Sequence, residues 1–154
     1  MTIHTSTSTT SPTRTLVPAG ITVLRVVVGL VFVAYGWQKI STNTVAGVTG
    51  YFTSLGVPLP ELMAPFIAYL EFLGGIALIL GLLTRPLALL FICDMIGAAI
   101  FAHLPNGFYV ENGGFSQVLL LGSAALAIAL IGPGSYSVDR YLFGRKESRV
   151  SVLA

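Results

Sequence analysis

Three ionisable side chains, Arg25, Glu71 and Asp94, lie well inside long apolar stretches of the sequence. In a membrane helix, each of them costs about 2.5 to 3.5 kcal/mol near the bilayer centre, so the chain must compensate their charges. At about 1.5 Å of rise per residue, the three lie at depths that a long arginine side chain can bridge. We therefore predict that they form one buried charge cluster.

This predicted cluster has two interpretations. In the structural one, Arg25 locks the helices together by pairing with one or both acids. In the functional one, the charges do not balance, so an acid stays protonated or a cation or polar ligand completes the site. Arg25, Glu71 and Asp94 are then catalytic residues that handle protons for a redox ligand such as a quinone. Glu71 is the expected proton carrier, because it lies nearer the middle of the membrane than Asp94.

Small residues accompany these charges at helical spacing. Arg25, Gly29, Gly36 and Lys39 fall on one helix face, and the glycines there allow either close helix packing or a groove for a ligand. Near the end of a later apolar stretch, His103 is placed either to relay protons or to form a hydrogen bond at the membrane interface. The residues that we predict to bind a ligand are Gly29, Gly36, Lys39, Gly74, Gly75 and His103. We predict no metal site.

The composition requires a membrane protein. Of 154 residues, 55% are hydrophobic and only 9% are charged, whereas about a quarter are charged in an average soluble domain. The formal net charge is only +2, without the basic clustering that suits a nucleic-acid backbone. Four apolar segments have about the length that crosses a bilayer, at residues 18–38, 62–83, 86–104 and 115–131. We expect an all-α bundle of four transmembrane helices, with a tight turn at residues 84–86 between the second and third.

The basic residues predict the orientation of this bundle. Most of them flank one side of the membrane domain and Lys39 lies on the other, so both termini should be cytoplasmic. In the first outer loop, Val45, Val48, Phe52 and Leu55 recur at helical spacing. They predict a short helix that lies on the membrane surface.

One membrane domain accounts for most of the chain. Residues 1–15 are rich in serine and threonine, which predicts a disordered N-terminal tail. Residues 16–143 form the membrane domain, and residues 144–154 form a cytoplasmic C-terminal tail. The single cysteine excludes dithiol exchange within the chain, and the lack of a histidine pair in the membrane disfavours haem. We expect no covalently bound cofactor.

Several spaced motifs carry a family resemblance. They are Arg25-x-x-x-Gly29, Gly36-Trp-Gln-Lys39, Tyr51-Phe52-x-x-x-Gly56-x-Pro58, Glu71-x-x-Gly74-Gly75, Gly81-x-x-Thr84-Arg85, Asp94-Met95 ahead of His103, Asn112-Gly113-Gly114, and Gly132-Pro133-Gly134 with Ser137-Val-Asp139. Over residues 24–139 this pattern resembles the DoxX family of small four-helix membrane proteins. The resemblance implies links to quinone-reducing oxidoreductases and to thiol and oxidative-stress systems in bacteria. The N-terminal tail and the lack of organelle signals suit a bacterial plasma membrane as the location.

Three functions are compatible with these features. The leading one is a membrane subunit, embedded in the lipid bilayer, that holds a quinone and exchanges electrons with a soluble redox partner. One alternative is a small proton-coupled transporter, for which intramembrane acids are equally suitable. The other is a scaffold or assembly protein whose buried charges are purely structural. A homo-oligomer is compatible with all three.

Overall fold

The computed structural model describes residues 13–142, and this part of the chain contains helices and no strand. In chain order, the elements are α1 (Thr13–Trp37), η1 (Gln38–Thr42), α2 (Val45–Ser54), α3 (Pro60–Tyr69), η2 (Leu70–Gly74), α4 (Gly75–Leu80), α5 (Thr84–Ala98), η3 (Ala99–His103), η4 (Leu104–Asn106), η5 (Val110–Asn112) and α6 (Ser116–Ile131). The predicted tails lie outside the described residues, except that residues 13–15 already belong to α1. The all-α prediction is confirmed.

Three continuous helical stretches are long and apolar enough to cross a membrane. Their ranges are Leu16–Thr42, Pro60–Leu80 and Thr84–Asn106, while the apolar helix α6 is shorter, with 16 residues. Large hydrophobic side chains are exposed along all of these helices, as expected for surfaces that face lipid. The predicted membrane bundle is therefore confirmed, and the side on which the termini lie stays a prediction.

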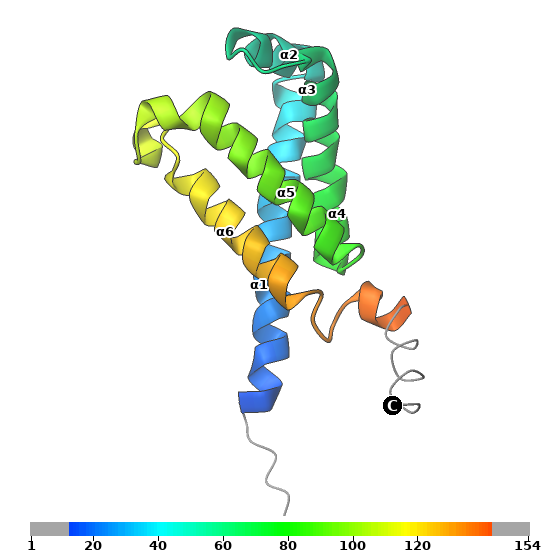
Figure 1. The fold of residues 1–154 in the computed structure, drawn as a ribbon. Coiled ribbons are helices and arrows are strands. Elements are labelled where there is room, and N and C mark those ends of the chain that lie inside the picture. Colours follow the sequence, from blue (N-terminus) through cyan, green and yellow to red (C-terminus); the bar gives the residue numbers. More distant parts are fainter. Residues whose placement is uncertain (1–12, 143–154) are drawn as a thin grey trace, which may run out of the picture.

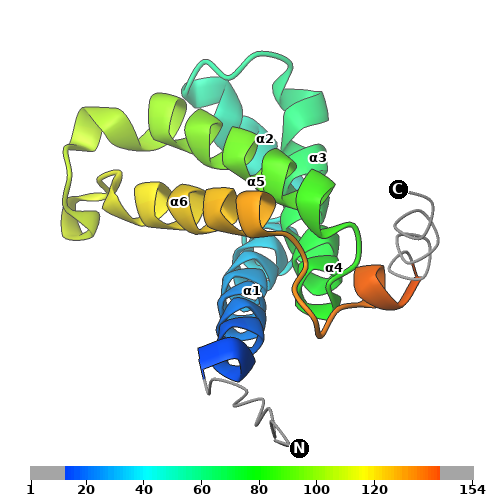
Figure 2. The same cartoon turned by 60° about the horizontal axis from the view of Figure 1, so that its bottom comes forward.

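The helices form two antiparallel pairs. α1 lies along the stretch formed by α3, η2 and α4, while α5 pairs with α6 and crosses α1 at an angle (Figure 1). Figure 2 shows α5 and α6 side by side across α1. Where the pairs cross, the ring of Phe32 on α1 stacks on Phe91 of α5 with a centroid distance of 3.8 Å. Leu78 of α4 belongs to the same buried cluster, so apolar side chains fill the centre of the bundle.

Glycines let α1 pack closely against its partner stretch. A β-carbon at Gly29 would lie 2.6 Å from a side-chain carbon of Ile79 and 2.8 Å from the carbonyl oxygen of Gly75. A β-carbon at Gly36 would clash with the backbone of Phe72. Of the two alternatives that the sequence left for Gly29 and Gly36, close packing is the one that forms.

The short helix predicted from Val45, Val48, Phe52 and Leu55 is confirmed as α2, which lies across one end of the bundle in Figure 1, while its place on the membrane surface stays a prediction. The Thr44 side chain caps its first turn by accepting a hydrogen bond from the Gly47 amide at 3.2 Å. Shortly after its last residue, Gly56 has a φ of 72°, a left-handed conformation that glycine adopts readily. These two connections place α2 beside α3.

The turn between α4 and α5 lies at residues 81–83, which corrects the prediction of a turn at 84–86. Gly81 ends α4 with a φ of 72°, and α5 already begins at Thr84. Pro86 is therefore in the first turn of α5. A proline is tolerated there because the amides of the first helical turn have no partner within the helix.

Candidate functional site

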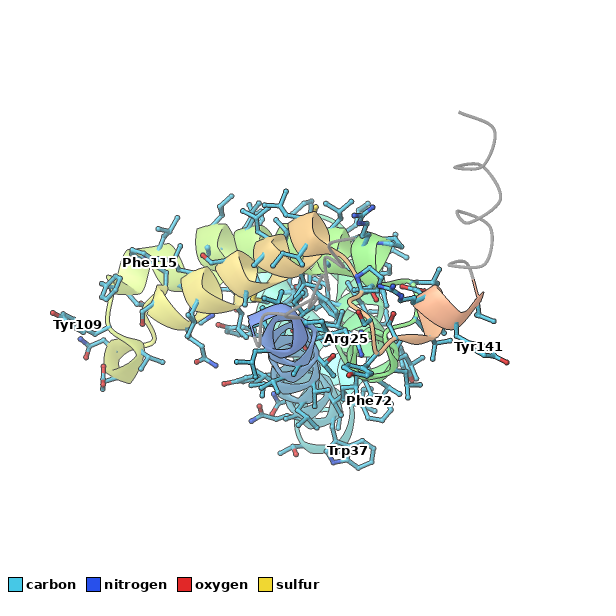
Figure 3. All side chains as sticks on the ribbon, turned by 90° about the horizontal axis from the view of Figure 1, so that it is seen from below. Arg25, Trp37, Phe72, Tyr109, Phe115 and Tyr141 are labelled. Carbon is cyan, nitrogen blue, oxygen red and sulfur yellow. The ribbon has the colours of Figure 1, made fainter. Side chains whose placement is uncertain are left out.

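Arg25 is only 2% exposed, and its guanidinium donates hydrogen bonds to backbone carbonyls. One terminal nitrogen donates to the carbonyl of Pro133. The other donates to the carbonyls of Tyr136 at 2.6 Å and Ile79 at 3.4 Å. Arg25 therefore ties α1 both to α4 and to the segment that follows α6. Figure 3 looks at the bundle from this end, with Arg25 beside α1.

Asp139 holds the same segment from its other side. Its two carboxylate oxygens accept hydrogen bonds from the amides of Leu83 and Thr84, each at 2.8 Å. Its own amide donates to the carbonyl of Gly81 at 2.9 Å. A β-carbon at Gly81 would lie 2.5 Å from the guanidinium of Arg25, so only glycine fits there. We call Arg25, Gly81 and Asp139 the Arg25 network, and its contacts are structural.

A second charged group lies farther along α1. Lys39 of η1 forms an ion pair with Glu71 of η2, between Nζ and Oε2. Asp94 of α5 lies near this ion pair and lines the same cavity as Lys39 and Glu71. Glu71 and Asp94 are 3% and 8% exposed, and Oδ2 of Asp94 has no hydrogen-bond partner among the described residues. We call Lys39, Glu71 and Asp94 the charge triad.

The structure corrects one member of the predicted cluster. The cation beside the two acids is Lys39, whereas Arg25 donates to the carbonyls of the Arg25 network. Both residues lie on the inward face of the first helical stretch, but 14 positions apart, which corresponds to about 21 Å. Arg25 therefore holds helices together through backbone carbonyls, and the pairing with Glu71 or Asp94 that the structural interpretation assumed is not observed. The functional interpretation stays open for the charge triad, where one cation again faces two carboxyls.

The charge triad lines a cavity of about 470 Å³. The cavity lies between the α3–η2 stretch and the α5–η3 stretch, and η1, α2 and the loop after α2 contribute the rest of its wall. Its polar lining residues are Lys39, Glu71, Asp94 and His103, while Tyr51, Phe52, Leu55, Phe66, Gly97 and Phe101 are among the apolar and aromatic ones. The site is thus a mostly apolar cavity with a small charged region.

Three of these polar residues lie on π-helical turns. Lys39, Glu71 and His103 belong to η1, η2 and η3, which have five residues each. A π-helical turn widens the helix locally, and such turns occur frequently at functional sites. The sequence does not indicate these turns, because their residues follow the same hydrophobic pattern as the α-helical turns around them.

His103 lies at the cavity with one ring nitrogen already bonded. Its Nδ1 is 2.7 Å from the carbonyl oxygen of Gly113. A carbonyl only accepts hydrogen bonds, so Nδ1 is the donor and Nε2 is left for other partners. The predicted hydrogen bond of His103 is confirmed by this contact, whereas its role as a proton relay stays a prediction.

The structure separates the predicted ligand-binding residues into two groups. Lys39 and His103 line the cavity. The four glycines lie in helix contacts instead, where Gly29, Gly36 and Gly75 join α1 to its partner stretch and Gly74 packs against α5. Aromatic residues that were not predicted as ligand contacts also line the cavity, among them Tyr51, Phe52 and Phe101. The position of Phe52 on the apolar face of α2 was the sequence feature that could have indicated its contact with the cavity.

This arrangement can hold a largely apolar molecule and exchange protons with it. The aromatic and aliphatic walls favour a ring system. The ion pair of Lys39 and Glu71 is balanced, while no second cation from the described part of the chain pairs with the neighbouring Asp94. A carboxyl in that setting is suited to bind and release a proton.

Comparison with known proteins gives matches over most of the chain. The DoxX family model matches residues 20–104. Inner membrane protein YqjF of Escherichia coli is 34% identical, over 84% of this chain and 96% of YqjF. The protein named "Putative oxidoreductase CatD" of Bacillus subtilis is 36% identical, over 86% of this chain and 95% of CatD. Inner membrane protein YphA of E. coli is 33% identical, over 80% and 90%. No solved structure matches the chain.

Proposed function

We propose that this chain, which belongs to the DoxX family, is the membrane subunit of a redox complex and binds a lipid-soluble quinone in the cavity beside the charge triad. Its location as a multi-pass protein of a bacterial inner membrane agrees with its apolar helices and with its relatives YqjF and YphA. The observation that carries the proposal is the buried Oδ2 of Asp94, which has no hydrogen-bond partner within residues 13–142 and lies at the charged region of an apolar cavity.

The residues of the cavity fit a quinone head group. Such a group is a flat, neutral ring with oxygens on its edge, and pockets for small molecules combine apolar walls with a few polar groups that set orientation. Phe52, Phe66 and Phe101 supply aromatic walls. Lys39 keeps ammonium protons that can hydrogen-bond to a ring oxygen, because Glu71 accepts from only one of them. An isoprenoid tail would extend into the surrounding lipid.

A bound quinone supplies two-electron chemistry that also takes up two protons. In this chain, Asp94 is the residue best placed to hold and deliver a proton, because Lys39 already pairs with Glu71. The contacts thus favour Asp94 over Glu71, the carrier expected from membrane depth. His103 can pass protons between this region and the end of the helix. The electrons come from a soluble partner, and the printed name of the relative CatD supports an oxidoreductase complex.

Native mass spectrometry of the gently extracted protein tests this proposal. We expect a quinone that stays bound to the chain in a one-to-one ratio, together with a soluble subunit in a fraction of the particles. Limited delipidation should remove ordinary phospholipid before it removes the quinone, because the head group contacts aromatic walls and polar groups in the cavity. A chain that carries neither quinone nor partner under these conditions contradicts the proposal and supports the scaffold alternative.

A further inference from the structure

We propose that the same cavity binds a lipophilic organic monocation in exchange for one proton, with the cationic centre beside Asp94. This inference rests on the cavity and the charge triad and not on the proposed quinone. A quinone is neutral, so either proposal can fail without the other.

The charges of the acids and the cation at the cavity do not balance. With both acids ionised, Glu71 and Asp94 carry two negative charges against the single positive charge of Lys39. The other titratable groups here are Tyr35, whose ring lies 5.7 Å from Lys39, and the cavity residues Tyr51, Cys93 and His103. Tyrosine and cysteine side chains never carry a positive charge, and His103 is counted as neutral, as it is in the formal net charge of the chain. The ionised cavity therefore has one negative charge in excess.

The excess negative charge is located at Asp94. Lys39 bonds to Glu71, while Oδ2 of Asp94 is buried without a hydrogen-bond partner in the described part of the chain. A buried charge without a partner is strongly unfavourable. The acids must therefore keep one proton between them or receive a cation from outside.

The cavity suits an organic cation and not a metal ion. A hard metal ion needs several oxygen or nitrogen ligands, and residues 13–142 contain no group of three or more acids, histidines or cysteines that could supply them. The walls are instead aromatic, with Tyr51, Phe52, Phe66 and Phe101 along the cavity. Aromatic faces attract organic cations, and apolar walls favour apolar substituents around the charge. An onium ion with bulky apolar groups matches both features.

Binding of a cation in the cavity is coupled to the release of a proton. The cavity is neutral either with a proton on the acids or with a monocation beside Asp94, so the two compete. Binding of the cation should release about one proton and should strengthen as the pH rises. Exchange of this kind is the binding step that a proton-coupled carrier of organic cations requires.

Calorimetric titration of the full-length protein in nanodiscs with tetraphenylphosphonium tests this inference. We expect one site per chain, with an affinity that rises up to tenfold per pH unit while the acids retain a proton. Titrations in two buffers that differ in ionisation enthalpy should show about one proton released per cation. Triphenylphosphine oxide, which is neutral and of similar shape, should not release a proton.

Three variants make the test specific. Asp94→Asn and Glu71→Gln each leave Lys39 with one acid, so both variants should fold and both should bind the cation at least tenfold more weakly, without proton release. Glu61→Gln removes an acid at the start of α3 that does not line the cavity, and it should bind like the parent. The inference is overturned if the parent binds the cation without pH dependence. It is equally overturned if Asp94→Asn and Glu71→Gln keep the parent's affinity.

Discussion

Replacing Arg25 by alanine is expected to lower the free energy of unfolding by about 3 to 5 kcal/mol and to reduce the amount of protein in the membrane. Its guanidinium donates to the carbonyls of Pro133 and Tyr136, and only weakly, at 3.4 Å, to that of Ile79. Hydrogen bonds from a charged donor contribute about 1.5 to 3 kcal/mol each, so the first two account for the expected loss. Their loss also frees the segment after α6 from α4. The measurement is thermal or denaturant unfolding in detergent, followed by the fluorescence of Trp37, the single tryptophan.

The control for this prediction separates the Arg25 network from the charge triad. Adding Glu71→Gln to Arg25→Ala should change the stability by no more than the sum of the two single effects, since residues without shared partners behave additively. Arg25→Lys should restore only part of the loss, because an ammonium cannot reproduce the planar fork of the guanidinium. Recovery of stability by Glu71→Gln would instead show that Arg25 balances that acid.

Replacing Lys39 by methionine is the second change with a large expected effect, again about 3 to 5 kcal/mol. The variant keeps the length of the side chain but leaves Glu71 and Asp94 without their cation. Glu71→Gln in the same chain should recover most of the loss, because an amide needs no counter-charge. Unfolding of the parent, both single variants and the double variant gives the interaction energy directly.

The same recovery should not occur with an unrelated acid. Glu61→Gln removes an equal charge from α3 outside the cavity, so combined with Lys39→Met it should leave the stability low. If Lys39→Met and Glu71→Gln turn out to be additive, the ion pair does not stabilise the bundle. The opposite behaviours expected for Arg25 and Lys39 toward Glu71 thus distinguish the observed network from the predicted one.

Most of the fold could be predicted from the sequence, because lipid imposes a simple rule on it. Long apolar segments must be helices whose backbone groups bond internally, and four such segments are visible in the sequence. The helix α2 was also predictable from the spacing of its apolar residues. The turn between α4 and α5 was predicted at the wrong residues, because Thr84, Arg85 and Pro86 suit the first turn of a helix as well as a loop.

The partners of the buried charges could not be predicted in the same way. Helical periodicity places Arg25 and Lys39 on one face, but it does not say which of them meets Glu71. Which residue meets Glu71 depends on the register between α1 and its partner stretch. It also depends on the segment after α6, whose carbonyls accept the hydrogen bonds of Arg25. The π-helical turn around Glu71 also changes where its side chain lies, and nothing in the local sequence indicates it.

The cavity itself is a property of the assembled helices. Gly29 and Gly36 suggested a groove, yet their lack of side chains brings two helices into contact instead. Gly97 shows the opposite outcome, because it lines the cavity and a β-carbon there would meet no atom within 4 Å. Whether a glycine marks packing or open space is decided by the neighbouring helix, which the sequence does not place.

Gly97 therefore provides the most direct test of the claim that the cavity holds a quinone. Leucine at this position should fill the cavity without a clash against the backbone, whereas Gly20→Leu, at a position on α1 that is equally open but does not line the cavity, is the matched control. The measurement is titration of a short-chain ubiquinone analogue into the parent and both variants in nanodiscs, with folding checked by thermal unfolding.

We expect saturable one-to-one binding to the parent and to Gly20→Leu, and at least a tenfold loss of affinity in a folded Gly97→Leu. Unchanged binding by Gly97→Leu would show that the quinone lies outside this cavity.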